Sequence, residues 1–310
     1  MGGILLVPVA LFVLLVIHGA DASRSYPTNE HADAKFHTPV NETNSIRRLI
    51  GQPSNPEGNT TMTHLALYNV QSILGGYYHG FIGTMDVYAF TLKPGQGSET
   101  SFSLANPGDD RPTPSVGMTK GMTIGWHVLP DVYGDSHTHL FTLWTNDGFQ
   151  STGCLNTKCP GFQAEKGAAI APGDIIEHVS YPKGAKQNLN LKIIKDSTSG
   201  DWLVHVGLNR EPELIGRFPR SLFTGYFANR ATAVRFGGTA TKPAPMGSGY
   251  LPADGKSAAS ISNIHIIDQK GLALPLTEDL PGVMTDSTVY ALSHVVNGSF
   301  FYGGPWKATA

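Results

Sequence analysis

The chain has 310 residues, 40% of them hydrophobic, which is enough for one large domain or two small ones. Its formal net charge is −2 and no basic run extends beyond Arg47-Arg48, which excludes the electrostatic surface typical of a nucleic-acid-binding protein. The 36 glycines and 21 prolines are dispersed, which excludes collagen-like and low-complexity chains and predicts many short elements separated by turns.

The N-terminus carries an apolar run at residues 4–17, followed by the small-residue site Ala20-Asp21-Ala22. This pattern is typical of a secretory signal peptide, which we place at residues 1–22. A retained signal anchor is the alternative, because the leading Met-Gly-Gly has no basic residue. No later segment is apolar enough to span a bilayer, so we expect no membrane contact after cleavage.

Residues 23–62 are polar and rich in Asn, Thr and Pro. They predict a flexible leader or a short pro-segment rather than part of a core. Glycosylation sequons begin at Asn41 and Asn59 within this segment, and a third begins at Asn297 near the C-terminus. In an exported chain the three sequons predict glycans on exposed loops.

From residue 63 onward, short stretches alternate apolar and polar residues, as at 189–193 and 202–208. Turn clusters at 106–109, 133–135, 146–148 and 199–201 separate them. The one credible helical stretch runs from 220 to 233. This pattern predicts an all-β fold, an antiparallel β-sandwich of two facing sheets with a cleft and one short helix. We place this single domain at residues 63–305, with a tail at 306–310.

Two of the predicted strands have one apolar and one small, polar face. In the stretch 121–128, Met122, Ile124, Trp126 and Val128 share the apolar face, and Thr123, Gly125 and His127 share the other. In the stretch 232–241, Arg235, Gly237 and Thr239 share the polar face. Two such strands facing one another would make a cleft floored by small residues where a ligand backbone can approach. An ordinary solvated face is the plainer interpretation.

The aromatic residues of the segment after these strands divide into two groups. Alternation assigns Trp126 to the core. Trp144 shares a face with Thr142, opposite Phe141 and Leu143, so the pattern leaves open whether it lines a groove or packs in the core.

Cysteine and histidine spacing bears on disulfide and metal chemistry. Cys154 and Cys159 are the only cysteines, and their close spacing in a secreted chain predicts a disulfide. His137 and His139 form the only close histidine pair, without an evident third ligand. We therefore predict neither a metal nor a cofactor.

The run GWHVLPDVYGDSHTHLFTLWTNDGFQSTGCLNTKCPGF at 125–162 closely resembles the core signature of the neprosin family of secreted plant proteins. The motifs KDSTSGDW, IGRFPRSLF, VRFGG, MGSGYLPADG and FYGGP follow in the family's order, so the resemblance covers about residues 63–305. It implies a β-sandwich of two antiparallel sheets and a glutamic peptidase that cleaves after proline at acidic pH. In such enzymes two glutamates from facing strands hold a water molecule and share a proton.

The sequence departs from the family at both glutamate positions. These positions lie two residues before Gly-Trp and directly after Gly-Gly, where this chain has Thr123 and Thr239. Threonine has no proton that titrates in the acidic range, so it does not replace a carboxylate as a general base. We expect the two threonines to face each other, where their hydroxyls can satisfy each other or a water molecule, and we expect the family's reaction to be lost.

These observations predict a secreted, catalytically impaired protein with a groove for an extended, proline-containing peptide or cell-wall protein, in the apoplast, the cell wall or the vacuole. The groove is expected to be lined by Gly125, His127, Tyr133, Trp144, Arg235 and Gly237. The alternative is an active acid endopeptidase that uses other carboxylates, such as Glu99 or Glu177. A purely structural protein without a ligand is a third hypothesis.

Overall fold

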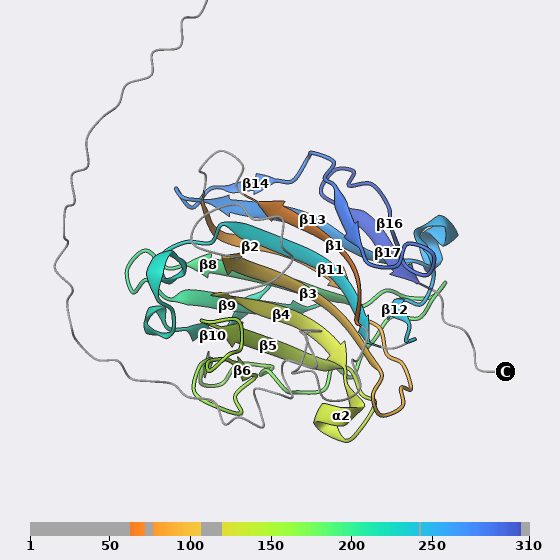
Figure 1. The fold of residues 1–310 in the computed structure, drawn as a ribbon, viewed down its shortest axis with the longest axis horizontal. Helices are drawn as coiled ribbons and strands as arrows, with labels where there is room; N and C mark the ends of the chain where they lie inside the picture. Colours follow the sequence, from red (N-terminus) through yellow and green to blue (C-terminus); the bar gives the residue numbers. More distant parts are fainter. Residues whose placement is uncertain (1–62, 72–76, 107–119, 242, 305–310) are drawn as a thin grey trace, which may run out of the picture. The chain divides into compact units, whose positions relative to one another are not determined.

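A computed structural model describes residues 63–71, 77–106, 120–241 and 243–304 of the chain. The predicted signal peptide, leader and tail lie outside the described residues, as do Asn41 and Asn59. Within the described ranges the regular structure is almost entirely β, in two sheets whose strands pair antiparallel (Figure 1). The predicted all-β fold with two antiparallel sheets is confirmed.

The first sheet contains seven strands among the described residues, and we call it the front sheet. Its order is β15 (Gly282–Met284), β1 (Thr63–Gln71), β11 (Ala233–Thr241), β3 (Gly97–Asn106), β4 (Lys120–Val128), β5 (His139–Thr145) and β6 (Cys154–Leu155). The predicted strands at 121–128 and 232–241 are therefore β4 and β11. They do not face each other from opposite sheets, because both lie in the front sheet with β3 between them.

The second sheet, which we call the back sheet, has ten strands in the part of the chain that is described. Along its main path the order is β12 (Met246–Gly247), β17 (Phe300–Gly304), β13 (Ala259–Asp268), β2 (Tyr78–Asp86), β8 (Asn188–Lys195), β9 (Trp202–Leu208), β10 (Glu213–Phe218) and β7 (Gln163–Ala164). The short strands β14 (Ala273–Pro275) and β16 (Ala291–Leu292) pair with β13 and β17.

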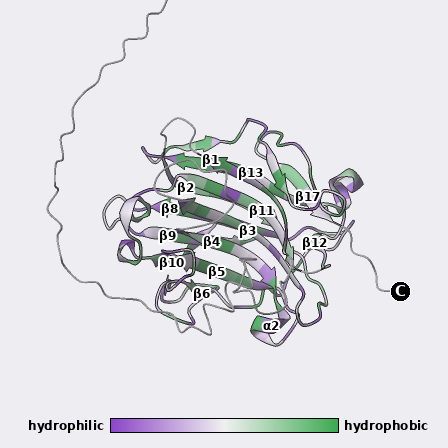
Figure 2. Cartoon of the chain, viewed as in Figure 1, coloured by the Kyte–Doolittle hydropathy of each residue, from purple (hydrophilic) through white to green (hydrophobic). Residues whose placement is uncertain are grey.

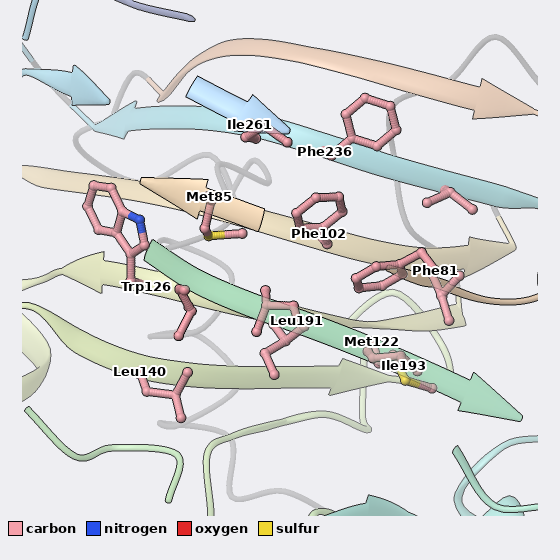
Figure 3. Close-up of a cluster of buried hydrophobic side chains, with 14 of the residues drawn as sticks. Phe81, Met85, Phe102, Met122, Trp126, Leu140, Leu191, Ile193, Phe236 and Ile261 are labelled. Carbon is pink, nitrogen blue, oxygen red and sulfur yellow. The ribbon is translucent and has the colours of Figure 1, made fainter. Parts of the chain in front are cut away.

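Alternation along the strands places the core between the two sheets. Figure 2 shows that the strands carry both hydrophobic and hydrophilic residues along their length. The alternate apolar residues of β4, from Met122 to Val128, are fully buried, and they join one cluster with residues of the back sheet such as Leu191 (Figure 3). Burial of this apolar surface is the main contribution to stability.

Aromatic rings from the two sheets pack against each other at the centre of this core. Phe102 of β3 stacks on Phe81 of β2, with ring centroids 4.7 Å apart. Gly83 makes this packing possible, because a Cβ atom there would lie 2.2 Å from the Phe102 ring. Glycine is therefore required where the ring crosses β2.

Two hydrogen bonds also cross between the sheets. The Trp126 indole donates to the backbone oxygen of Asp86 at 2.9 Å, and the hydroxyls of Thr100 and Tyr302 lie 2.7 Å apart. The Asp86 carboxylate accepts bonds from Lys186 Nζ and from the backbone and hydroxyl of Ser260. These bonds satisfy polar groups that would otherwise be costly to bury.

Helical structure is short and differs from the prediction. The expected helix at 220–233 consists of two 3₁₀ turns, η1 (Arg220–Leu222) and η2 (Gly225–Ala228), and the chain then returns to an extended bridge at Ala231. The apolar spacing there serves burial of Leu222 and Phe227 rather than a continuous helix. A short α-helix, α2 (Pro130–Tyr133), and a third 3₁₀ segment, η3 (Pro252–Ser257), were not predicted. Within the described ranges, no helix has the length and apolar character needed to cross a membrane.

Candidate functional site

The face of the front sheet that points away from the core, which we call the outer face, carries the sequence-predicted polar residues. Strand register arranges its side chains in three rows across β1, β11, β3, β4 and β5. The Thr123 row contains Asn69, Arg235, Ser103, Thr123 and Leu143. The Gly125 row contains Leu67, Gly237, Ser101, Gly125 and Phe141. The His127 row contains Leu65, Thr239, Glu99, His127 and His139.

The Thr123 row contains two hydrogen-bonded pairs and no carboxylate. The hydroxyls of Ser103 and Thr123 lie 2.8 Å apart, and Arg235 Nε donates to Asn69 Oδ1 at 3.3 Å. Thr123 and Arg235 are each only 6% exposed. Burial lowers the pKa of Arg235 to about 10, which leaves the guanidinium charged at neutral and acidic pH. The row therefore offers hydroxyl and guanidinium donors and no general base in the acidic range.

Thr239 does not belong to this row. Thr123 pairs with Ser103 and Thr239 pairs with Glu99, which are four residues apart on β3 (103 − 99 = 4). At about 3.3 Å per residue, the two rows are about 13 Å apart along the strands. The expectation that Thr123 and Thr239 face each other is therefore wrong. Ser103 is the hydrogen-bonding neighbour of Thr123, and Arg235 is the β11 residue in its row.

The Gly125 row has little side-chain bulk at its centre. Gly237, Ser101 and Gly125 occupy it on the adjacent strands β11, β3 and β4. The polar Thr123 and His127 rows lie two residues away on either side, about 7 Å from the Gly125 row. Gly125 and Gly237 are themselves buried, and their place beside a ligand main chain stays a prediction.

The His127 row contains the one carboxylate among these fifteen row positions. Glu99 lies between Thr239 and His127 on the neighbouring strands, and Ser101 Oγ donates to Glu99 Oε1 at 2.8 Å. Burial raises the pKa of Glu99 to about 7, while the Ser101 hydroxyl opposes this shift. A carboxyl group with such a pKa can donate or accept a proton near neutral pH.

Tyr133 of α2 connects His127 to the loop that follows β5. Asn156 Nδ2 donates to the Tyr133 hydroxyl oxygen at 2.9 Å, and the hydroxyl lies 2.7 Å from His127 Nε2. The hydroxyl therefore bridges Asn156 and the His127 imidazole. Burial, then the nearby His139 and Lys158, hold the pKa of His127 well below its usual value, so this imidazole is neutral.

His139 sits on the other side of Tyr133. Its ring stacks on Tyr133 with centroids 3.7 Å apart, and its two nitrogens contact Gly173 O at 2.8 Å and Asp135 Oδ1 at 3.1 Å. A carbonyl and a carboxylate oxygen are both hydrogen-bond acceptors, and together they hold the His139 ring in place against Tyr133. The described residues contain no group of three or more side chains placed to hold a metal ion.

The family comparison adds to this geometry. The model of the family described as Neprosin matches residues 97–305. The chain belongs to the neprosin family. Among solved structures, it is similar to scytalido-glutamic peptidase with a peptide-based transition-state analogue, at 7% identity and a TM-score of 0.40, covering 79% of this chain and 98% of that one. It is also similar to SCP-B, a member of the eqolisin family of peptidases in a complex with the tripeptide Ala-Ile-His, at 7% identity and a TM-score of 0.37, covering 78% and 97%.

Trp144 does not line the outer face of this neprosin domain. It pairs with Met122 on the core side, is 1% exposed and packs edge-on against Phe223 at 6.0 Å. Its indole lies under the segment after the cysteines, where a Cβ atom on Gly161 would be 2.0 Å from Trp144 Nε1. Its assignment to the groove is therefore wrong.

The ambiguity at Trp144 arose because both faces of β5 are buried. The opposite face of β5 has its own apolar cluster, formed by Phe141, Leu143, Phe149 and Leu155. Alternation alone does not show which of two buried faces belongs to the main core.

The remaining predicted residues have clear positions in the neprosin domain. Cys154 and Cys159 form the predicted disulfide, with their Cα atoms 5.8 Å apart. Glu177 is exposed and lies outside the strands. Asn297 is exposed at the tip of a tight turn between Val296 and Ser299, where its sequon stays a prediction of glycosylation.

The sequence did not indicate Ser103, Asn69 or Asn156 as parts of the site. Each of them completes a hydrogen bond to a predicted residue. Ser103 and Asn69 acquire this role only through strand register, and Asn156 reaches Tyr133 through a loop. The one sequence pattern that could have indicated Ser103 is the alternation along β3, which puts Ser101 and Ser103 on the same face as Glu99.

Proposed function

We propose that this chain is a secreted neprosin-family protein that binds extended, proline-containing peptides on the outer face of the front sheet without cleaving them by a glutamate pair. The observation that carries this proposal is the Thr123 row, which holds Thr123, Ser103 and Arg235 where two acids would need to share one water molecule. Geometry favours Arg235 over Thr239 as the partner of Thr123, because only Arg235 lies in the same row.

The chemistry of the outer face supports peptide binding. The Gly125 row carries little side-chain bulk, and the neighbouring Thr123 row holds hydroxyls and a guanidinium, which are groups that hydrogen-bond with peptide carbonyls. Proline-rich peptides are already extended, so they lose little conformational entropy on docking. The apolar signal-like segment and the disulfide between Cys154 and Cys159 support export to an oxidising compartment.

The test uses the secreted chain with a quenched proline-containing reporter peptide at acidic and neutral pH. We expect saturable binding by fluorescence anisotropy and no cleavage by mass spectrometry. Ser101→Phe fills the Gly125 row and is expected to weaken binding by about tenfold or more. Ser262→Phe, on β13 of the back sheet, is the matched control and should leave binding unchanged. Unchanged binding by Ser101→Phe would remove the outer face as the binding site.

A second candidate function is an acid endopeptidase that uses Glu99. It is favoured by one observation, the pKa of about 7 for a carboxyl group that stands beside Thr239 and His127 on the outer face. Cleavage of the reporter that is lost in Glu99→Gln, with binding retained, would establish this activity and overturn the non-cleaving proposal. Cleavage that survives Glu99→Gln would exclude both. The exposed Glu177 has no comparable setting and serves as the control in Glu177→Gln.

A further inference from the structure

A second candidate binding site lies at one end of the sandwich, away from the three rows of the outer face. It is a cavity of about 660 Å³ between the start of β1, the connection from β2 to β3, the segment after β11 and the turn after β15. His64 lines the cavity and pairs with Ala240, whose side chain lies on the core side of the front sheet. The cavity therefore belongs to the inside of the sandwich. A ligand bound there would be separate from the peptide of the proposed function.

The wall of this cavity is mostly apolar. Phe90, Leu92, Ala244 and Tyr290 are buried, and two prolines and Val289 complete the apolar lining. A cavity of this size and character is typical of small-molecule sites, which combine apolar walls with a few polar groups that fix orientation. The wall fits a flat or aromatic ligand better than an extended chain, because Tyr290 presents its ring with the hydroxyl turned away to donate to Ala244 O at 2.8 Å.

Several polar side chains of the wall are already satisfied within the protein. Gln96 donates to Pro243 O at 2.6 Å and accepts from the backbone of Lys93 at 2.9 Å. Thr288 donates its hydroxyl to Asp286 Oδ1 at 2.6 Å, and its backbone N–H donates to the same oxygen at 3.1 Å. These groups shape the cavity and leave little capacity for a ligand.

The remaining capacity for hydrogen bonds to a ligand lies at His64 and Asp286. Asp286 Oδ2 lies 3.9 Å from His64 Nδ1, which is too long for a hydrogen bond, and both hydrogen bonds from Thr288 go to the other carboxylate oxygen, Oδ1. The side chains of His64 and Asp286 are 13% and 30% exposed, so the pair is partly screened from solvent. A donor group placed between them would complete the site.

The charges around the cavity favour a neutral ligand. Asp286 contributes one negative charge and Lys93, which is exposed at the rim, contributes one positive charge. The formal charges of Asp286 and Lys93 sum to zero. A ligand with a net charge would meet an unfavourable partner on one side, whereas a neutral hydroxyl can donate to the Asp286 carboxylate and accept from the imidazole.

We propose that this cavity binds a neutral aromatic alcohol, with the aromatic ring between Phe90, Val289 and Tyr290 and the hydroxyl donating to Asp286 Oδ2. The recognised features are the flat apolar body and the single donor group. Removal of the donor leaves the carboxylate oxygen without its partner, so the hydroxyl contributes most of the selectivity.

The test uses isothermal titration calorimetry of the full secreted chain with three probes, 2-naphthol, 2-methoxynaphthalene and 2-naphthoate. We expect 2-naphthol to bind at one site with a dissociation constant below about 1 mM and about tenfold more tightly than the methyl ether. Tighter binding of the anionic naphthoate would overturn the inference of a neutral ligand. Equal binding of 2-naphthol and its methyl ether, or no saturation by 2-naphthol, would overturn the proposal itself.

Two pairs of variants assign the binding to this cavity. Asp286→Asn should reduce the preference for 2-naphthol over its ether to less than about threefold, and the same change at exposed Asp279 should leave it intact. Val289→Trp fills the cavity and should abolish binding, whereas Val296→Trp on an exposed turn should not. A full preference in folded Asp286→Asn would contradict the proposed contact, even if Val289→Trp fails to fold.

Discussion

Thr123 and Arg235 lie in one row of the outer face, two strands apart, with the hydroxyl of Ser103 between them and 2.8 Å from that of Thr123. At about 4.8 Å between strands, their backbones are about 10 Å apart. Side chains of glutamate length at these two positions would meet above Ser103. This relationship identifies the pair of positions at which two carboxylates could act together.

Replacement of Thr123 and Arg235 by glutamate is expected to create a coupled pair of carboxyl groups. Their two apparent pKa values should differ by at least about one unit, because two nearby carboxylates do not ionise independently. In Thr123→Glu with Thr239→Glu, about 13 Å of offset should leave the two groups nearly independent. NMR titration of ¹³C-labelled glutamate measures the pKa values in both double variants. The double variant with glutamine at 123 and 235 controls for folding. Independent titration in the first pair would contradict this row assignment.

Glu99→Gln is expected to stabilise the protein at alkaline pH. The pKa of Glu99 is about 7 in the folded state and near 4.5 when unfolded, so ionisation opposes folding. The native protein should lose stability as pH rises from about 4.5 through 7, and the variant should not share this loss. The difference is on the order of 2–3 kcal/mol above pH 8 and near zero below pH 4. Urea unfolding across this pH range checks it, and a constant difference between the two proteins would count against the shifted pKa.

Tyr133→Phe is expected to destabilise the fold by roughly 1–3 kcal/mol, because His127 Nε2 and Asn156 Nδ2 both lose their partner. Tyr226→Phe, on an exposed ring, is the matched control and should cost less than about 0.5 kcal/mol. Thermal unfolding of the two variants gives the comparison. Equal effects would show that the Tyr133 hydroxyl contributes nothing to the fold.

Asp86→Ala is expected to be among the most destabilising single changes, at roughly 3–5 kcal/mol. It leaves Lys186 Nζ and two donors of Ser260 without the acceptor that lies 2.7 to 3.0 Å away. Asp196→Ala removes an acceptor of two bonds from Ser199 in an exposed turn and should cost much less. Denaturant midpoints for the two variants measure the contrast, and similar midpoints would argue against the role of the Asp86 carboxylate within the back sheet.

The fold could be predicted from the sequence because alternation and turns are local properties. The buried side of β4 follows directly from Met122, Ile124 and Trp126, and the disulfide follows from the spacing of its cysteines. The prediction of a helix at 220–233 was wrong because 3₁₀ turns and continuous helices can show the same partial spacing of apolar residues.

The candidate site could be predicted only in part, because strand register is a property of the whole sheet. The sequence places Thr123 and Thr239 on polar faces, but it does not show that β3 lies between their strands or that their rows are offset by four residues. The same limit hid the contacts of Arg235 with Asn69 and of Thr123 with Ser103. The prediction for Trp144 was wrong for another reason. Both faces of β5 are buried, so the sequence shows no difference in polarity between them.

The alternation of β3 and β4 separates two kinds of change that this protein can tolerate. The residues that join the two sheets, such as Phe102 and Trp126, point inward, whereas Ser103 and Thr123 point the other way. Substitutions on the outer face therefore alter chemistry while leaving the cross-sheet contacts in place. In such a scaffold, single replacements of outward-facing residues can remove one activity and introduce another. The fold is kept at each replacement.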